Sequence, residues 1–287
     1  MQVRPFSRSA LELIAERCSH RTYDGASLDP QLRARLVEAL ESPPGTPFGN
    51  EVRLELVESF DARARGVRLG TYGMIQGARD FIVGGVRPGA RDMEDFGFVF
   101  ELAVLQATDL GLGTCWLGGT LKRGAFAEAA GLPEEMIVPA VSPVGRVKAR
   151  RSLVDSATRA LARSSKRKAP SELFFEGSFD RPLDAGGELA QVLAAVRLAP
   201  SASNRQPWRT VRAGDGALHF FVRRTPGYAS VTAVDLQRID MGIAMCHFQL
   251  AAGELGLEGG WTEMRPEGIP LPPRVEYAFS WRPGPGA

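Results

Sequence analysis

One stretch of the chain occurs twice. Residues 95–116 (DFGFVFELAVLQATDLGLGTCW) align without gaps to residues 240–261 (DMGIAMCHFQLAAGELGLEGGW), each position recurring 145 residues later. The Asp, Gly, Leu, Ala, Leu-Gly-Leu and Trp positions are in register. A repeat of this kind indicates that the chain holds two copies of one structural unit.

Each copy predicts the same local structure. Apolar residues at helical spacing predict a helix that begins near Asp95 in the first copy and near Asp240 in the second. Glycine at 111 and at 256 is expected to end these helices. A strand is then expected to begin at Trp116 and at Trp261.

The order of elements upstream of each copy also repeats. The expected elements are helices opened by Leu28-Asp29 and Leu183-Asp184, Pro-rich loops at 42–49 and 199–207, and strands at 52–57, 80–86, 208–211 and 218–223. Helices and strands thus alternate in both halves, which predicts an α+β fold, an α/β sandwich, in which neither half completes a site alone. We expect a first repeat over residues 1–150, a linking helix and basic linker over 151–175, and a second repeat over 176–287.

Composition excludes several classes of protein. The 287 residues are 44% hydrophobic, enough to bury a full core. No run of 18 apolar residues occurs and charges interrupt the N-terminal stretch, so a cytoplasmic protein is expected. The net charge is only +2, which gives no reason to expect nucleic acid or a membrane as partner. The basic run at 163–168 lacks interleaved aromatic residues and is expected to be a solvated linker rather than a nucleic-acid patch.

The cysteines and histidines form no recognisable cluster. Cys18, Cys115 and Cys246 lie far apart, which argues against a disulfide framework and against a zinc site, so free thiols and no metal are expected. The three histidines, at 20, 219 and 247, form no triad and are expected to be structural or exposed.

The halves differ where chemistry is expected. In an extended segment Arg17, Ser19 and Arg21 project to one side, and two guanidinium groups with a hydroxyl suit a phosphate monoester. The other interpretation is a basic helix C-terminus that offsets the helix dipole, and the spacing leaves both open. The second half carries only EGSFD, residues 176–180, in the corresponding place, which cannot form that anion site.

The Pro-rich loops show the opposite asymmetry. The second half has PSASN at 200–204, where the first has PGTPF at 44–48. Small residues with exposed amides can lie against a flat heteroaromatic ring, although an ordinary Asn-containing turn is the alternative. Taken together, the complementary losses predict one composite site to which each half supplies what the other lacks.

These motifs together resemble the FMN-dependent nitroreductase family. The resemblance rests on R-x-S-x-R near the N-terminus, PSASNRQPW before a strand, and LGLGTCWLGG followed by VGRVKARR. The repeat is similar to the branch in which two copies are fused in one chain. The resemblance implies a duplicated fold of mostly antiparallel sheets flanked by helices, one FMN per chain, a second site that is lost, and a monomer that imitates a dimer.

The resemblance also implies a set of cofactor-binding residues. Arg17, Cys18 and Ser19 are expected at the phosphate with Lys148 and Arg150, and Arg21 near the pyrimidine edge. Leu117, Gly118 and Gly119 are expected on the N5 side, and Pro200, Ser201, Ala202 and Asn204 at the ring and ribityl chain. Tyr72 and Gly73 match the family only weakly at the pyrimidine edge.

In such enzymes NAD(P)H delivers hydride to the flavin, and a nitroaromatic, a quinone or a similar small electrophile then takes it. No side-chain acid or base is required, so no catalytic residue is assigned. Two alternatives stay open: a flavin-binding or storage protein without turnover, and a flavoenzyme of this fold with other chemistry, such as reductive dehalogenation or flavin cleavage. For the latter, residues 61–68 or 224–237 would be candidates for a lid.

Overall fold

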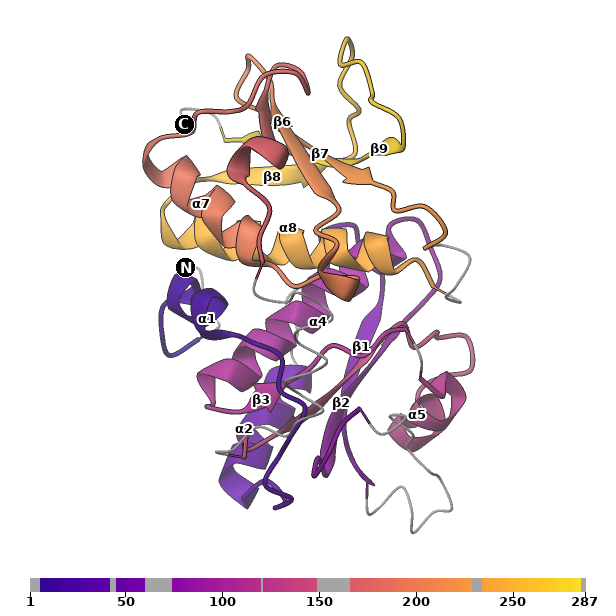
Figure 1. Cartoon of the computed structure of the whole chain (residues 1–287). Helices are drawn as coiled ribbons and strands as arrows, with labels where there is room; N and C mark the ends of the chain where they lie inside the picture. Colours follow the sequence, from indigo (N-terminus) through magenta and orange to yellow (C-terminus); the bar gives the residue numbers. More distant parts are fainter. Residues whose placement is uncertain are drawn as a thin grey trace.

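Two antiparallel-rich sheets, one from each half, form the frame of the protein (Figure 1). The computed structural model describes residues 6–41, 45–59, 74–119, 121–148, 166–228 and 234–284. The first sheet has the order β1-β2-β4-β3, with strands β1 (Val52–Glu58), β2 (Asp80–Val86), β3 (Gly113–Thr114) and β4 (Val141–Gly145). The second has the order β5-β6-β7-β9-β8, with strands β5 (Phe174–Glu176), β6 (Trp208–Arg212), β7 (Leu218–Arg223), β8 (Gly259–Thr262) and β9 (Val275–Pro283). Only the β5–β6 pair is parallel among these strands.

Helices cover these sheets and fill the space between them. The described helices are α1 (Ala10–Glu16), α2 (Pro30–Glu41), α4 (Asp92–Asp109), α5 (Arg123–Ala130), α7 (Gly187–Leu198) and α8 (Leu236–Glu254), with short 3₁₀ turns at Pro170–Glu172 and Ala202–Asn204. In Figure 1, α4 and α8 cross each other between the two sheets. The architecture confirms the predicted α+β class with mostly antiparallel sheets. Within the described ranges, no helix combines the length and the apolar character that a membrane span needs.

The α4–α8 contact relates the two halves symmetrically. A Cβ atom at Gly97 would collide with the carbonyl oxygen of Ile239, and one at Gly242 would collide with that of Glu94. Gly242 follows Gly97 by 145 positions, and Ile239 follows Glu94 by the same interval. The helices therefore pack through equivalent points, as the two subunits of a two-fold dimer do.

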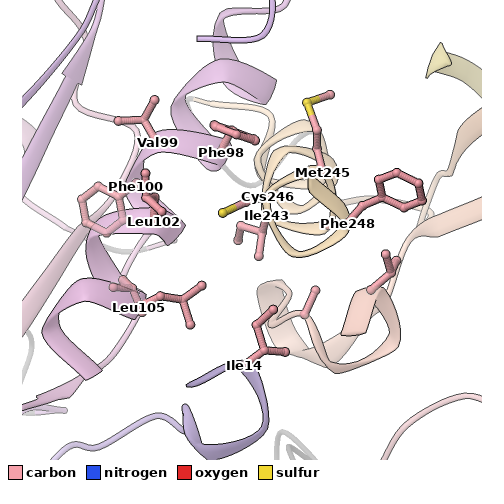
Figure 2. Packing of buried hydrophobic residues seen from close by; sticks show 14 of the residues in the cluster. Ile14, Phe98, Val99, Phe100, Leu102, Leu105, Ile243, Met245, Cys246 and Phe248 are labelled. Carbon is pink, nitrogen blue, oxygen red and sulfur yellow. The ribbon is translucent and has the colours of Figure 1, made fainter. Parts of the chain in front are cut away.

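A shared apolar core surrounds this crossing. Leu102 and Leu105 of α4 lie beside Ile243 and Cys246 of α8, and Ile14 of α1 closes the same cluster (Figure 2). Each of these side chains is at most 4% exposed. Because the core draws on both halves, neither half can expose its central helix without losing apolar burial.

The predicted bounds of two strands agree better with the structure than the predicted starts of the helices do. β2 and β7 have the predicted bounds, whereas α4 and α8 begin a few residues before Asp95 and Asp240. The cap of α8 is Asp235, whose carboxylate accepts hydrogen bonds from the backbone N–H groups of residues 237 and 238. Helix α7 begins at Gly187 rather than at Leu183-Asp184. The linking helix expected at 152–163 lies outside the described residues.

The strand expected to begin at Trp116 is also wrong in the first half. β3 ends at Thr114, and the indole N–H of Trp116 donates to the Glu101 carboxylate at 2.6 Å. In the second half a strand is present, but β8 begins at Gly259, before Trp261. The side chain of Trp116 is thus fixed by a buried carboxylate on α4 rather than by a strand.

Candidate functional site

A cavity of about 410 Å³ lies between the halves. Of the residues that the sequence singles out, the first half contributes Arg17, Cys18, Ser19, Arg21, Gly118 and Gly119 to its wall, and the second half contributes Pro200, Ser201, Ala202 and Asn204. The structure therefore brings together segments that lie almost 190 positions apart, such as Cys18 and Asn204.

Nine further residues line the cavity that sequence reasoning missed. They are Trp116, Ala140 and Arg167, and on the second half Ser203, Tyr228, Leu236, Ile239, Asp240 and Ile243. Two of them, Trp116 and Asp240, are identical to their counterparts in the other copy of the repeat, so their recurrence was a signal that was assigned only to helix and strand boundaries. Tyr228 and Leu236 fall in the candidate lid segment 224–237, whereas the other candidate, 61–68, lies outside the described residues.

The part of the cavity wall that residues 17–21 form begins at the C-terminal end of α1. Arg17 caps this helix, and its backbone N–H donates to the carbonyl of Leu13 at 2.9 Å. The chain then runs extended, with Ser19 in a parallel bridge to Thr114, and the backbone N–H of His20 donates to the Thr114 carbonyl at 2.8 Å. The extended course expected for this segment is therefore present, and it carries Arg17, Ser19 and Arg21 to the cavity.

A buried carboxylate stands behind this wall. Glu101 of α4 is fully buried, and one of its oxygens lies 3.6 Å from Nε of Arg17. The same carboxylate accepts from Trp116 and lies 3.0 Å from Nε2 of His247, while Nδ1 of His247 lies 2.9 Å from the Ala195 carbonyl. A carbonyl only accepts, so Nδ1 is the donor of that bond, and Nε2 faces the Glu101 carboxylate. His247 is thus buried and paired on both ring nitrogens, and through Glu101 it links α8 to the segment that begins at Arg17.

The opposite wall is the 200–204 loop. Ser203 and Asn204 have positive φ values of 49° and 53°, and Oγ of Ser201 accepts a hydrogen bond from the backbone N–H of Gln206 at 2.8 Å. The loop is anchored on α8, because Oδ1 of Asp240 accepts from the backbone N–H of Ala202 at 2.9 Å. Asn204 lines the cavity, but its amide also holds the linker: Nδ2 donates to the Lys166 carbonyl at 2.8 Å.

The linker supplies a cavity residue of its own. Arg167 donates from Nη1 to Oδ1 of Asn204 at 3.0 Å and from Nη2 to the Leu198 carbonyl at 3.2 Å. Burial, and then the charges of Arg17 and Arg197, lower the pKa of Arg167 to about 10. The expectation of a solvated basic run is therefore wrong at Arg167, because side-chain and backbone acceptors of the second half draw its guanidinium inward.

Asp240 is the most unusual polar group of the wall. It is 3% exposed, and its Oδ2 has no hydrogen-bond partner among the described residues. Burial raises the pKa of this carboxyl well above its ordinary value of 3.8, against a smaller opposing effect of the hydrogen bond from Ala202. Burial therefore disfavours the charged form of this carboxyl relative to that of an exposed aspartate.

Comparison with known proteins gives this geometry a family. A family model described as "Putative TM nitroreductase" matches residues 9–252, most of the chain. The chain belongs to this nitroreductase family. No curated protein sequence matches it.

One solved structure supports the fold over both halves. A Thermotoga maritima MSB8 protein described as a "putative nitroreductase" is 18% identical, with a TM-score of 0.58, and the match covers 96% of this chain and 93% of that one. An FMN-bound nitroreductase from Desulfitobacterium hafniense DCB-2 is 19% identical with a TM-score of 0.41, and the match covers 50% of this chain and 92% of that one. The first match spans both halves of this nitroreductase family member, which fits a duplicated fold.

Five of the expected site residues do not appear in the cavity wall. Leu117 is buried in a separate apolar cluster and pairs with Val141. Lys148 is exposed, and its backbone N–H donates to the Thr22 carbonyl at 3.2 Å. Tyr72, Gly73 and Arg150 lie outside the described residues.

The structure gives a reason for glycine at position 118 that the sequence did not reveal. A Cβ atom there would lie 2.9 Å from Cδ2 of Leu236 on α8, so the glycine admits a side chain of the other half. Its carbonyl oxygen accepts from Nη2 of Arg123 at 2.6 Å. At Gly119 a Cβ would meet no atom within 4 Å. The backbone of this segment is thus both held in place and open on one side.

Proposed function

We propose that this protein is an FMN-dependent oxidoreductase that takes hydride from NADH or NADPH and passes it to a nitroaromatic, a quinone or a similar small electrophile. The observation that carries the proposal is the composite cavity, in which the arginine-bearing segment of the first half faces the small-residue loop of the second. The nitroreductase family membership gives this cavity its chemical interpretation.

The residues present fit the cofactor. A volume of about 410 Å³ lies within the usual range of small-molecule sites. The guanidinium group of Arg17 suits a phosphate monoester because it can donate parallel hydrogen bonds to its oxygens, and that of Arg21 would lie near the pyrimidine edge. The apolar side chains of Ile239 and Ile243 and the uncovered backbone at Gly119 suit a flat ring.

FMN, when bound, would supply a two-electron carrier whose ring accepts and releases hydride. The chain's own residues bind and orient it and set the local charge. The cavity residues Arg17 and Arg21 add positive charge, which favours electron uptake by a ligand held there. The Glu101 carboxylate pairs with Arg17 and accepts a hydrogen bond from Trp116, and both contacts help to position these side chains.

We further propose one FMN per chain and a monomer that imitates a dimer. The loop of the first half that corresponds to 200–204 carries Phe48, whose ring packs against Phe279 of β9 with centroids 6.1 Å apart. A phenylalanine in that place leaves no small-residue surface for a ring. The domain division at 1–150, 151–175 and 176–287 belongs to the same proposal.

An anaerobic titration tests the function. Protein loaded with FMN is titrated with NADH and with NADPH while the flavin absorbance is followed, and a panel of nitroaromatics and quinones is then added. We expect bleaching by at least one nicotinamide and recovery of the absorbance with an oxidant. Bound FMN that neither nicotinamide reduces would favour the flavin-binding or storage alternative.

A further inference from the structure

A group of positively charged side chains lies outside the cavity, beside the wall that the second half forms. The members of this basic patch are Lys168, Arg205, Arg209 and Arg223. None of the four belongs to the described cavity wall, but Lys168 follows Arg167 and Arg205 follows Asn204, which do. Since consecutive Cα atoms are about 3.8 Å apart, the basic patch begins at the rim of the cavity.

The strand register gathers two of these arginines on one face of the second sheet. Arg209 of β6 pairs with Phe221 of β7, and the backbone N–H of Arg223 donates to the Pro207 carbonyl at 2.8 Å. Residues two apart in a strand share a face, so Arg209 and Arg223 lie on the same face. Both lie at the end of β6 and β7 that adjoins the 200–204 loop.

The linker brings Lys168 to the same place. The buried side chain of Gln206 accepts the backbone N–H of Lys168 on Oε1 at 2.8 Å and donates from Nε2 to the Lys166 carbonyl at 3.2 Å. Burial, and then the charges of the three arginines of the basic patch, lower the pKa of Lys168. The four cations therefore lie within electrostatic range of one another.

One carboxylate, that of Glu172, opposes these cations. It lies 3.9 Å from Nζ of Lys168, and it also accepts the backbone N–H of Ala169 at 3.0 Å. Within the part of the chain that the structure describes, no carboxylate forms a salt bridge with the three arginines of the basic patch. Four cations and one acid leave an excess of positive charge, which attracts an anion that carries more than one charge.

The burial of Arg209 makes this excess costly. Its side chain is 4% exposed, and Nη1 donates to the carbonyl oxygens of Gln206 and Trp208 at 3.0 and 2.6 Å, which are neutral acceptors. Burial, and then the charge of Arg223, lower the pKa of Arg209 to about 10. Arg205 and Arg223 are exposed, so an anion can reach them from solvent and offset part of that cost.

The size of the cavity indicates which anion would lie at its rim. About 410 Å³ suits one small molecule, so a dinucleotide whose nicotinamide reaches a flavin held there would keep its adenosine end outside. NADPH and NADH differ at that end, because NADPH carries a phosphate on the 2′ oxygen of its adenosine ribose. Arginine is suited to this group, since its planar guanidinium donates paired hydrogen bonds to phosphate oxygens.

We propose that the basic patch binds the 2′-phosphate of NADPH, with Arg205 and Arg223 as its direct donors, and that the protein therefore prefers NADPH to NADH. The inference rests on the proposed function for the use of a nicotinamide donor. Lys168 and Arg209 add charge behind the two exposed arginines.

Two nucleotides that differ only in this phosphate provide the first test. Dissociation constants of adenosine 2′,5′-bisphosphate and adenosine 5′-monophosphate are measured by calorimetry for the wild type, Arg205→Gln, Arg223→Gln and Arg265→Gln. Glutamine stays polar but removes the charge. Arg265 is the matched control, because it is an exposed arginine of the second half that follows β8, the strand at the far edge of the same sheet.

The wild type is expected to bind the bisphosphate at least about 10-fold more tightly than the monophosphate, the effect of one charge-assisted hydrogen bond. Arg205→Gln and Arg223→Gln should each weaken bisphosphate binding about 10-fold and monophosphate binding less than about two-fold. Arg265→Gln should change neither constant more than about two-fold. Added salt should weaken bisphosphate binding more in the wild type than in the two patch variants.

Reduction of the FMN-loaded protein provides the second test. KM is measured for NADPH and for NADH in the same four proteins. The ratio of the KM for NADH to the KM for NADPH should fall about 10-fold in Arg205→Gln and in Arg223→Gln, because only NADPH has the phosphate that these arginines bind. In Arg265→Gln the ratio should stay within about two-fold of the wild-type value.

Three results would overturn the inference. The first is a wild type that binds both adenosine nucleotides alike, and the second is an equal loss of both in the patch variants, which would mean that the arginines only order this surface. The third is a labelled single-stranded oligonucleotide that binds more tightly than the bisphosphate and is released by the same variants, which would make the basic patch a nucleic-acid surface. Phosphate-dependent nucleotide binding by a protein whose flavin neither nicotinamide reduces would support the 2′-phosphate site and contradict the proposed function alone.

Discussion

Asp95 of α4 and Asp240 of α8 occupy equivalent positions, yet they have different surroundings. Asp95 accepts the backbone N–H of Phe48 on one oxygen and two N–H groups of Asn50 on the other. Asp240 accepts only the backbone N–H of Ala202, and its second oxygen is unpartnered among the described residues. Both aspartates anchor the loop of their own half, but only Asp240 also lines the cavity.

This comparison separates the positions that both halves share from those that only one half has. The anchoring of each loop on its central helix is retained in both halves, because the fold needs it. The outer surface of the loop has changed: Phe48 packs into the protein in the first half, whereas Ser201 and Asn204 face the cavity in the second. The aspartate that anchors the loop is therefore common to both halves, whereas the loop residues that face the cavity in the second half have no counterpart in the first.

The largest effect is expected at a position where the halves are unlike. Glu101 corresponds to Cys246 in the repeat. Glu101→Ala leaves buried Arg17 and His247 without their carboxylate and should lower the free energy of unfolding by about 3–5 kcal/mol. Cys246→Ala, which only removes a buried sulfur, should cost about 1 kcal/mol. Urea denaturation measures the free energy of unfolding of both variants. Equal losses would contradict the role given to the Glu101 carboxylate.

The helix crossing offers a test of the symmetry. Gly97→Ala and Gly242→Ala each drive a methyl group into a backbone carbonyl of the other helix, and each should cost about 2–3 kcal/mol of unfolding free energy. Gly124→Ala in α5 is the control, because its Cβ meets no atom within 4 Å and alanine favours the helix. Thermal and urea unfolding measure the three variants. If only one of the crossing glycines were sensitive, the two-fold relation of the helices would be wrong.

The paired aspartates give a smaller effect. Asp95→Asn places an amide N–H₂ among donors and should lower the unfolding free energy by about 1–3 kcal/mol at pH 7. Asp240→Asn keeps an oxygen for Ala202 and should lower it by less than about 1 kcal/mol. Chemical denaturation at pH 7 compares the two variants. A loss at Asp240 as large as that at Asp95 would show that its second oxygen is engaged.

The same pair predicts a pH dependence. The pKa of Asp240 is raised in the folded protein, mainly by burial, so the folded state binds this proton more tightly than the unfolded state does. The contribution of Asp240 to stability is therefore lost as the pH rises from the ordinary value of 3.8 towards the raised one. Unfolding curves measured between pH 4 and pH 7 should show the free energy of unfolding of Asp240→Asn rising relative to that of the wild type as the pH rises. A constant difference would mean that the carboxyl titrates normally.

The smallest effect is expected at Lys148. The family resemblance implied that this residue lies at the phosphate, but it is exposed and absent from the described cavity wall. Lys148→Ala should change the FMN dissociation constant less than about two-fold, whereas Arg17→Ala should raise it about 10- to 100-fold. Fluorescence titration compares the two. A large effect of Lys148→Ala would restore it to the phosphate subsite.

Much of the frame was predictable because the patterns behind it are local. The predicted bounds of β2 and β7 agree with the structure, and the repeat indicated that α4 and α8 are equivalent. The cavity residues that were missed depend on long-range packing. Arg167 lies in a basic run typical of a solvated linker, and only the fold shows that Asn204 and Leu198 draw it inward.

The different contributions of the two halves to the cavity wall were predictable from the motifs that each half lacks. The hydrogen bonds within the wall were not predictable. The absence of Ser and Asn from 44–48 indicated a single composite site. The hydrogen bonds of Asn204 to the linker, and the unpartnered oxygen of Asp240, follow from the loop's three-dimensional course, which residue types alone do not specify.

The stoichiometry of FMN binding tests the composite site most directly. Equilibrium dialysis of the wild type, Arg17→Ala and Asn204→Ala against FMN gives the number of sites and the contribution of each half. The account predicts one FMN per chain and weaker binding in both variants, although the two residues come from different halves. Two FMN per chain, or binding that depends on only one of these residues, would contradict it.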